Sequence, residues 1–86
     1  MVEKQIGEIT HYYHKIHVAV LALTGSIHVG EKVHILGNTT DLEQDVKSLQ
    51  IDHQAVDEAQ PGQDVAMKVT GRVRGGDRVY TIHPVE

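Results

Sequence analysis

Alternating apolar and polar residues, interrupted by glycines, constrain the fold of this chain more than any other feature of its sequence. The alternation is clearest over residues 16–21, 33–36, 65–70 and 79–82. Side chains two positions apart point to the same face of a β-strand, and the β-branched residues that are dense in these runs favour strands. We therefore expect about six short strands in a small all-β barrel or sandwich, in which closure would remove exposed edge strands.

Glycines fall between the alternating runs, where tight turns need a positive φ. Gly30 separates two of the runs, and Pro61-Gly62 is a stronger turn signal of the same kind. Gly75-Gly76 is expected to form a hairpin tip or the start of the last strand. These positions predict where the chain reverses direction.

Residues 40–59 are the one segment whose spacing also suits a helix. Leu42, Val46 and Leu49 lie four and three residues apart, which is helical spacing. The alternation that runs through Leu49 and Ile51 suits a long bent strand instead. We favour the strand.

Composition excludes several ways of stabilising or locating a chain of 86 residues. There is no cysteine to form disulfides or thiolate metal sites, and three tyrosines without phenylalanine or tryptophan leave an aliphatic core. The longest largely apolar run, residues 16–27, is too short to span a membrane as a helix, and no signal peptide is recognisable. We expect one domain over residues 1–86, a cytoplasmic location and no membrane partner.

Charge is unevenly distributed along the chain, whose formal net charge is −4. Residues 41–64 hold seven acidic residues and one lysine, whereas residues 65–86 hold four basic and two acidic residues. An acidic chain argues against broad electrostatic capture of nucleic acid. The asymmetry indicates either a bipolar surface that orients a partner or a solvated acidic face beside a mildly basic one.

The basic residues near the C-terminus form the first candidate partner-binding site. Alternation around Val69 and Val73 points these cations outward, and the turn at Gly75-Gly76 brings the last one back beside the others. We expect them to bind RNA or an acidic protein surface. The alternative is that they pair with Asp77 or with the acids of residues 41–64, where exposed pairs contribute only about 0–1 kcal/mol. The candidate residues are Lys68, Arg72, Arg74 and Arg78.

Tyr12 and Tyr13 form the second candidate site. Flanked by histidines and Lys15, they are the one patch of the sequence suited to stacking on RNA bases. In the alternative, one tyrosine packs at the end of the barrel while its neighbour faces solvent, since adjacent residues of a strand point to opposite faces.

Seven histidines raise the question of a metal site. His11, His14 and His17 would line one face of a helix, but the alternation places His17 on a strand, where His11 and His17 lie about 20 Å apart. The long-range pair of His28 with His34 lacks an identifiable third ligand. We expect no metal, and exposed histidines that make the net charge sensitive to pH.

No motif for catalysis or nucleotide binding is recognisable. The candidate nucleophiles Ser26 and Ser48 do not lie in a Gly-x-Ser-x-Gly elbow. Asp57-Glu58 lies within the acidic stretch, and no Gly-Lys-Ser/Thr loop is present to bind phosphate. We therefore expect that the chain is not an enzyme and that it needs no cofactor and binds no nucleotide.

The order of the motifs resembles the second domain of the translational GTPases, such as elongation factor Tu and bacterial initiation factor two. The motifs are G-x-I-x-V-G-x-x-V-x-I-x-G over residues 25–37, V-x-E-A-x-P-G-x-x-V over residues 56–65, and residues 74–80. The GTP-binding signatures of those factors are missing. The chain therefore looks like the stand-alone translation elongation factor-like proteins, which consist of this domain alone.

This resemblance implies a small closed six-stranded antiparallel barrel with Greek-key connections, over about residues 6–83. It implies a non-catalytic binding module associated with the ribosome or tRNA. A protein-interaction adaptor that docks onto a separate enzyme is the alternative. The side chains expected to fill the barrel are Val33, Ile35, Val65, Met67 and Val69, with Val56 and Ala59 closing one end.

Overall fold

The computed structural model describes residues 2–83, and this part of the chain contains β-strands but no helix. It therefore holds no helix long and apolar enough to cross a membrane. The predicted domain limits, 1–86, include Met1 and residues 84–86, which lie outside the described residues. The strands are β1 (Val2–Tyr13), β2 (Val18–Leu23), β3 (Ile27–His28), β4 (Lys32–Leu36), β5 (Asp41–Asp45), β6 (Leu49–Ile51), β7 (Gln54–Val56), β8 (Glu58–Ala59), β9 (Asp64–Lys68) and β10 (Arg78–His83).

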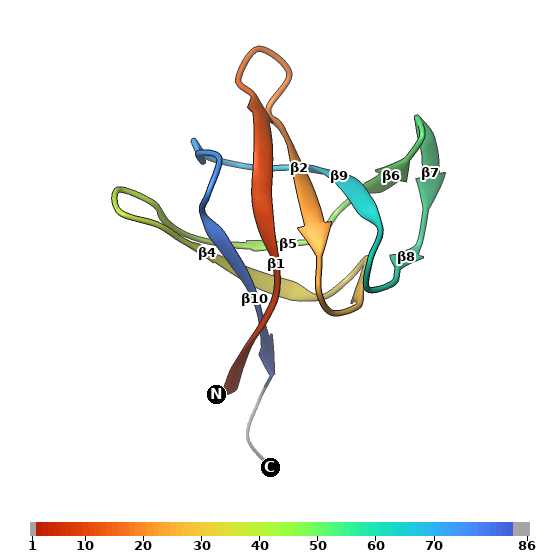
Figure 1. The fold of residues 1–86 in the computed structure, drawn as a ribbon, viewed down its shortest axis with the longest axis horizontal. Coiled ribbons are helices and arrows are strands. Elements are labelled where there is room, and N and C mark those ends of the chain that lie inside the picture. The colour runs from red at the N-terminus through yellow and green to blue at the C-terminus, as the bar shows by residue number, and fades with distance from the viewer. Residues whose placement is uncertain (1, 84–86) are drawn as a thin grey trace.

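Eight strands form one antiparallel sheet in the order β5-β4-β10-β1-β2-β9-β6-β7, and β3 pairs with β8 in a separate ribbon. The sheet curls, so that β4 and β5 run across the direction of β1 and β2 (Figure 1). The predicted all-β antiparallel class is confirmed. Over residues 2–83 no strand pairing joins the two edge strands β5 and β7, so the closed six-stranded barrel is not found, and the described strands number ten.

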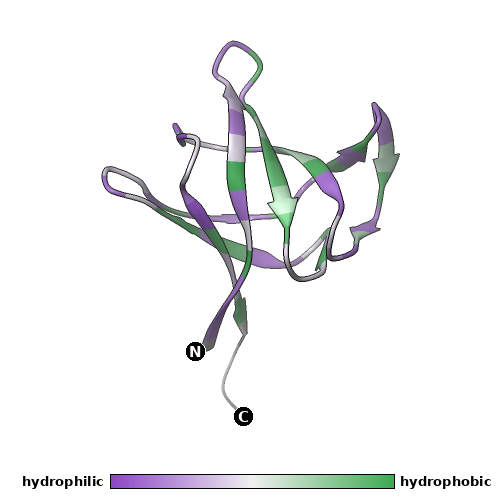
Figure 2. Ribbon diagram, in the orientation of Figure 1, coloured by the Kyte–Doolittle hydropathy of each residue, from purple (hydrophilic) through white to green (hydrophobic). Residues whose placement is uncertain are grey.

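The predicted alternation is confirmed in the packing of the strands, and Figure 2 shows hydrophobic and hydrophilic residues alternating along them. One face of the curled sheet encloses an aliphatic core, which is the main source of stability in a chain without disulfides. Val56 packs partly buried against this core. The predicted core residues that are at most 2% exposed are Val33, Ile35, Ala59, Val65, Met67, Val69 and Val73.

Three of the glycines predicted at turns adopt the positive φ that those turns require. The φ angles are 98° at Gly30, 90° at Gly62 and 94° at Gly76. An added Cβ would meet no atom within 4 Å at these positions, so conformation rather than space selects glycine there. Gly75-Gly76 leads into β10, as expected from the sequence.

The placement of His17 on a strand is wrong. Strand β1 ends at Tyr13, β2 begins at Val18, and the four residues between them form the turn of a hairpin. His17 has a φ of 55°, a left-handed conformation that a strand residue does not adopt. The alternation of Ile16 with Val18 crosses the boundary between turn and strand, so it continues the apparent strand pattern into the turn.

Residues 40–59 are extended, as favoured over the helix, but they form four short strands rather than one long bent strand. Strands β5, β6, β7 and β8 follow one another in this segment. Asp52 and His53, with φ angles of 50° and 64°, make the tight turn that pairs β6 with β7. The helical spacing of apolar residues here reflects successive short strands packing against one core.

A side chain links the edge strand β5 to the end of β9, an interior strand in the other half of the curled sheet. Gln44, on the edge strand β5, is 7% exposed. Its amide nitrogen donates a hydrogen bond of 2.9 Å to the Lys68 carbonyl, and its amide oxygen accepts one of 2.8 Å from the Thr70 backbone N–H. Gln44 thus supplies the hydrogen bonds that a neighbouring strand would otherwise give to the segment following β9. We call this junction between β5 and the end of β9 the seam.

Candidate functional site

The structure places five of the six predicted partner-binding residues at two separate sites and the sixth at neither. Lys68, Tyr12 and Tyr13 lie on the side of the molecule that carries the β1–β2 hairpin and the seam. Arg74 and Arg78 line a separate pocket. Arg72 is exposed between β9 and β10 and lines neither place. The single basic patch expected from the sequence is therefore two different environments.

Three shallow pockets follow one another along the hairpin side. The first, of about 460 Å³, lies at the seam and shares Lys68 with a second pocket of about 160 Å³. The second shares Ile16 with a third pocket of about 250 Å³ at the hairpin tip. Because neighbouring pockets share a lining residue, they adjoin one another, and we call the three together the hairpin groove. Its lining residues are Tyr12, Tyr13, His14, Lys15, Ile16, His17, Val18, Gln44, Lys47, Ser48, Gln50, Ala66, Lys68, Val69 and Thr70.

The hairpin tip exposes apolar side chains that the core does not use. Ile16 is 61% exposed and Tyr13 is 48% exposed. Tyr13 contacts the His11 ring at a centroid distance of 4.6 Å, while Tyr12 packs partly buried against the core. The expectation that one tyrosine packs inward and the other faces solvent is confirmed. Exposed apolar side chains that lie together often mark binding surfaces.

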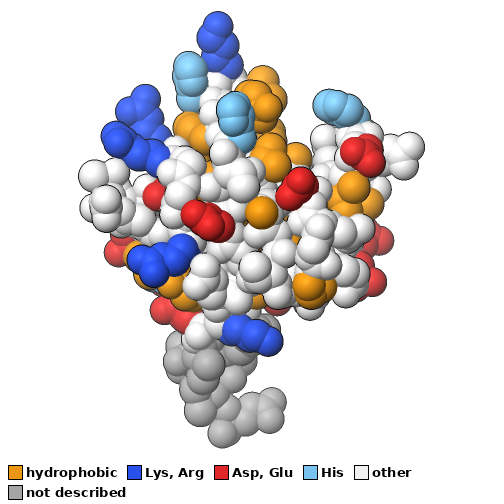
Figure 3. Space-filling model, in the orientation of Figure 1, with side chains coloured by type: hydrophobic (Ala, Val, Ile, Leu, Met, Phe, Trp, Pro, Cys, Tyr) orange, Lys and Arg blue, Asp and Glu red, His pale blue; other side chains and the backbone are white. Residues whose placement is uncertain are grey.

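The charged groups lining the hairpin groove are all basic. Lys15, Lys47 and Lys68 are exposed, and no aspartate or glutamate lines any of its three pockets. In Figure 3, Lys or Arg and histidine side chains gather with hydrophobic side chains over the β1–β2 hairpin. In a chain with twelve acidic and eight basic residues, this surface has a charge opposite to that of the whole molecule.

The pocket beside Arg74 and Arg78 has a different character. Its volume is about 400 Å³, and it is lined by the turn at Gly37 and by the glycine turn before β10. Asp77, in its lining, is 5% exposed and accepts a hydrogen bond of 2.8 Å from the Arg74 backbone N–H. This carboxylate offsets the positive charge of the two arginines, which weakens the pocket as a site for anions.

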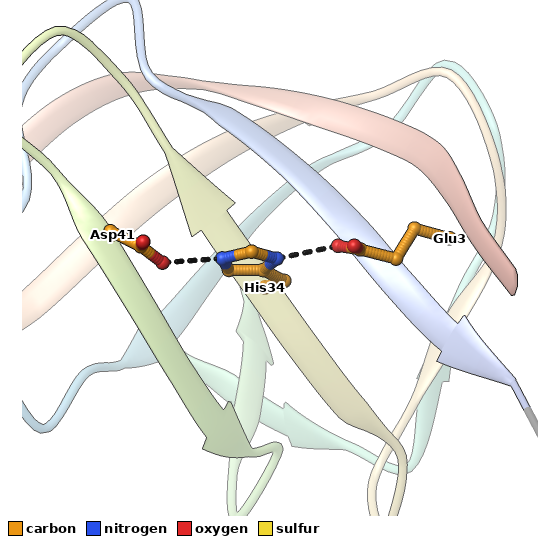
Figure 4. A network of polar contacts seen from close by, with 3 residues as sticks. All are labelled: Glu3, His34 and Asp41. Carbon is orange, nitrogen blue, oxygen red and sulfur yellow. Dashed lines mark hydrogen bonds and ion pairs between the residues drawn. The ribbon is translucent and has the colours of Figure 1, made fainter. Parts of the chain in front are cut away.

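A histidine lies between two carboxylates on the outer face of the sheet. Glu3 reaches across β10 to the Nδ1 atom of His34, and Asp41 contacts its Nε2 atom from β5 (Figure 4). The two distances are 2.5 and 2.6 Å. Hydrogen bonding to Asp41 raises the pKa of His34, burial opposes the rise, and Glu3 adds to it. The three side chains connect β1, β4 and β5.

The part of the chain that the structure describes contains no cluster of side chains suited to binding a metal ion. No group of three histidine, aspartate or glutamate residues there is placed to hold an ion. His28 contacts the Val29 carbonyl and Glu31, and His34 contacts Glu3 and Asp41. The pair of His28 with His34 considered from the sequence is therefore engaged with separate partners.

Sequence reasoning missed several residues of the hairpin groove. Ile16 was assigned to a strand face, and Lys47 was counted with the acidic stretch. Gln44 carried no signal, because its partners lie more than twenty residues away in the sequence. The available clue to Ile16 was its position as the one apolar residue of the polar segment His14-Lys15-Ile16-His17. An apolar residue in a turn cannot be buried by strand alternation.

These features define a small all-β domain with an antiparallel sheet and an apolar, basic surface on one side. The chain is 39% identical over 79 residues to an uncharacterized protease of Methanocaldococcus jannaschii, covering 91% of this chain and 19% of that protein. It is 30% identical over 77 residues to a collagenase of Porphyromonas gingivalis, covering 87% of this chain and 21% of the collagenase. It therefore spans about a fifth of the length of the curated relatives it matches.

The fold matches a solved domain from a similarly named protein. It superposes on the C-terminal domain of a Geobacillus thermoleovorans protein described as a U32 peptidase with a TM-score of 0.85. The match covers 91% of each chain at 17% sequence identity, and so concerns the fold. No protein-family model matches the chain. The similar proteins are of the U32 peptidase and collagenase type.

These comparisons correct three predictions. The resemblance to the second domain of translational GTPases is wrong, and with it the ribosome- or tRNA-associated module. The RNA-binding interpretation is overturned by the same relatives. The prediction that the chain is not an enzyme is also corrected: its relatives are named a protease and a collagenase, and the chain corresponds to about a fifth of each. The shared motifs are turn glycines and alternating strands, which several small curled sheets use.

Proposed function

We propose that this chain is the polypeptide-binding domain of a U32-type peptidase. The observation that carries the proposal is the match over nearly the whole chain to the C-terminal domain of a protein described as such a peptidase. Sequence similarity to a protease and a collagenase supports the same assignment. Within this proposal, the domain holds a polypeptide while peptide-bond cleavage takes place in the peptidase to which it contributes.

The shape of the domain suits this role. The hairpin groove consists of three adjoining shallow pockets that present apolar side chains together with hydrogen-bonding groups. Extended polypeptides bind through such mixtures of apolar pockets and polar contacts. A compact small molecule prefers one deep, enclosed pocket. We further propose that the curled sheet acts as an incomplete barrel whose seam is held by Gln44. A cytoplasmic location stays a prediction from the sequence.

The test is binding of unfolded polypeptide by the purified chain, which on this proposal does not itself cleave the polypeptide. Fluorescein-labelled gelatin and unfolded casein are titrated with the chain, anisotropy reports binding, and gel electrophoresis of the same samples reports cleavage. We expect saturable binding with a dissociation constant of about 1–100 μM, the range of modest interfaces. The control is a labelled folded protein whose net charge is similar to that of the unfolded polypeptides and which the chain should not bind. Absence of binding to both unfolded polypeptides would contradict the proposal.

A further inference from the structure

The hairpin groove combines two properties that restrict what can occupy it. Its apolar part is exposed on the hairpin, where Ile16 is 61% exposed, and continues through Val18 toward the seam. Its charged part consists of lysines without an opposing carboxylate in the lining. An occupant that buries the apolar side chains therefore places its own charges beside these lysines, and negative charges would be favoured there.

We propose, building on the function proposed above, that the hairpin groove selects polypeptide segments in which acidic residues are interspersed with apolar ones. The apolar side chains would cover Ile16 and Tyr13, and the carboxylates would pair with Lys47 and Lys68. In an extended peptide, neighbouring side chains point in opposite directions, so a segment of mixed sequence can meet an apolar strip and a basic rim at once.

A peptide fits the groove better than a long polyanion does. The chain carries a formal net charge of −4, which repels a molecule with a negative charge at every repeat. The exposed carboxylates of the edge strand β5, at Asp41, Glu43 and Asp45, add to that repulsion near the seam. A segment with a few carboxylates separated by apolar side chains places its charge only at the lysines. Single-stranded RNA is therefore an alternative for the test to exclude.

The experiment compares three labelled twelve-residue peptides by fluorescence anisotropy with the purified chain. One peptide alternates glutamate with leucine and valine, the second carries glutamine at each glutamate position, and the third carries lysine there. We expect the acidic peptide to bind about tenfold more tightly than the glutamine peptide and the lysine peptide to bind least, because a few exposed ion pairs together contribute about this much. Raising the salt concentration should bring the affinities of the three peptides closer together, because salt screens ion pairs.

Two pairs of variants locate the interaction. Lys47→Gln with Lys68→Gln should remove the preference for the acidic peptide, whereas Lys4→Gln with Lys32→Gln makes the same charge change outside the groove and should retain it. Ile16→Ser should weaken binding of both acidic and glutamine peptides about fivefold, as expected for loss of an exposed apolar contact. Val29→Ser, at a residue 38% exposed elsewhere, is its control. Melting temperatures confirm that each variant is folded.

The outcomes separate this inference from the proposed function. Equal binding of the three peptides, with gelatin still bound, would overturn the selectivity and leave the polypeptide-binding domain standing. A preference that survives in the Lys47 and Lys68 double variant would overturn the location. Binding of a single-stranded oligoribonucleotide more tightly than the acidic peptide would overturn the choice of occupant. Failure to bind any peptide or gelatin would overturn both proposals.

Discussion

The hairpin groove and the pocket beside Arg74 and Arg78 look alike in sequence, as basic residues next to small or aromatic ones, yet their structures differ. In the pocket, the buried Asp77 carboxylate holds the backbone of its own turn and offsets the arginines. In the groove, no aspartate or glutamate lines the pockets that contain Lys47 and Lys68, and apolar side chains remain exposed. The difference teaches that an outward-facing cation is free to meet a partner's charge only where no buried carboxylate of the same chain already offsets it.

The largest effect is expected from Gly37→Ala, which tests whether the arginine pocket is a packed structural corner. An added Cβ would overlap the carboxylate of Asp77, which is buried and hydrogen-bonded and so has little freedom to move. We expect a loss of about 2–3 kcal/mol in the free energy of unfolding. For a domain of this size, that lowers the melting temperature by roughly 10–20 °C.

Gly71→Ala is the matched control for Gly37→Ala. A Cβ at Gly71 would lie 3.4 Å from the Leu42 side chain, an ordinary contact distance. Its melting temperature should stay near that of the parent chain or rise slightly, because alanine restricts the unfolded chain more than glycine does. Equal melting temperatures for Gly37→Ala and the parent would show that the arginine pocket is loosely packed at Gly37. The pocket would then not differ from the hairpin groove in being a packed structural corner.

Gln44→Ala tests the groove side in the same way. The change leaves the Lys68 carbonyl and the Thr70 N–H without the amide that now bonds them, and we expect a loss of about 2 kcal/mol measured by urea unfolding. Gln54→Ala, at an exposed residue of β7, is the control and should change little. Amide hydrogen exchange at Thr70 should accelerate in Gln44→Ala alone. Unchanged protection there would mean that the seam is held by packing rather than by this side chain.

Much of the fold follows from the sequence because the signals are local. Alternation places Val33 and Val65 in the core, and the turn residues Gly30 and Gly62 have the expected positive φ. The ends of elements were less well determined, as His17 shows, because an apolar residue at a hairpin tip continues the apparent alternation into the turn.

The candidate site was predicted only in part, because its charges are arranged by long-range contacts. Lys68 and Tyr13 were identified, but no local pattern places them on one surface with Lys47. The closeness of Asp77 to Gly37, which distinguishes the arginine pocket, joins residues forty positions apart in the sequence. The family assignment failed for a related reason, since turn glycines and alternating strands specify a curled sheet rather than the activity attached to it.

A smaller effect is expected from pH, at the contact of Glu3, His34 and Asp41. Because the pKa of His34 is raised in the folded chain, the stabilisation is fully present below the ordinary histidine pKa of about 6.5 and is lost as the pH rises through the higher folded value. Urea unfolding between pH 5.5 and about 8.5 should show stability falling over this window.

Asp41→Asn should reduce that fall, since it removes the partner that contributes most to the raised pKa of His34. Glu43→Gln makes the same charge change at the residue that pairs with His34 in the strand register. In this variant, stability should still fall with rising pH more than it does in Asp41→Asn. Both variants leave the hairpin groove intact, so peptide binding reports separately on that surface. An identical pH profile for the two variants would show that net charge, rather than the contact with Asp41, causes the dependence.

The smallest effect on stability is expected from the combined change Arg72→Ala, Arg74→Ala and Arg78→Ala. All three side chains are exposed, and the hydrogen bond from residue 74 to Asp77 uses the backbone N–H, which alanine keeps. The melting temperature should stay within a few degrees of the parent value, as for most surface changes. Peptide binding by the hairpin groove should also persist. Loss of peptide binding would show that both basic regions bind the same partner, which would contradict the distinction between the hairpin groove and the arginine pocket.

The pairing of β1 with β10 has a consequence for how the chain folds. These two strands lie side by side within the sheet, with Val2 opposite His83, although they are the first and last strands of the described chain (Figure 1). Each also pairs on its other side, β1 with β2 and β10 with β4. During synthesis the two halves of the sheet therefore cannot be joined by strand pairing until β10 has been made. Contacts between residues so distant along the chain slow folding. Removal of β10 should leave one chain with two incomplete sheets rather than a smaller folded domain.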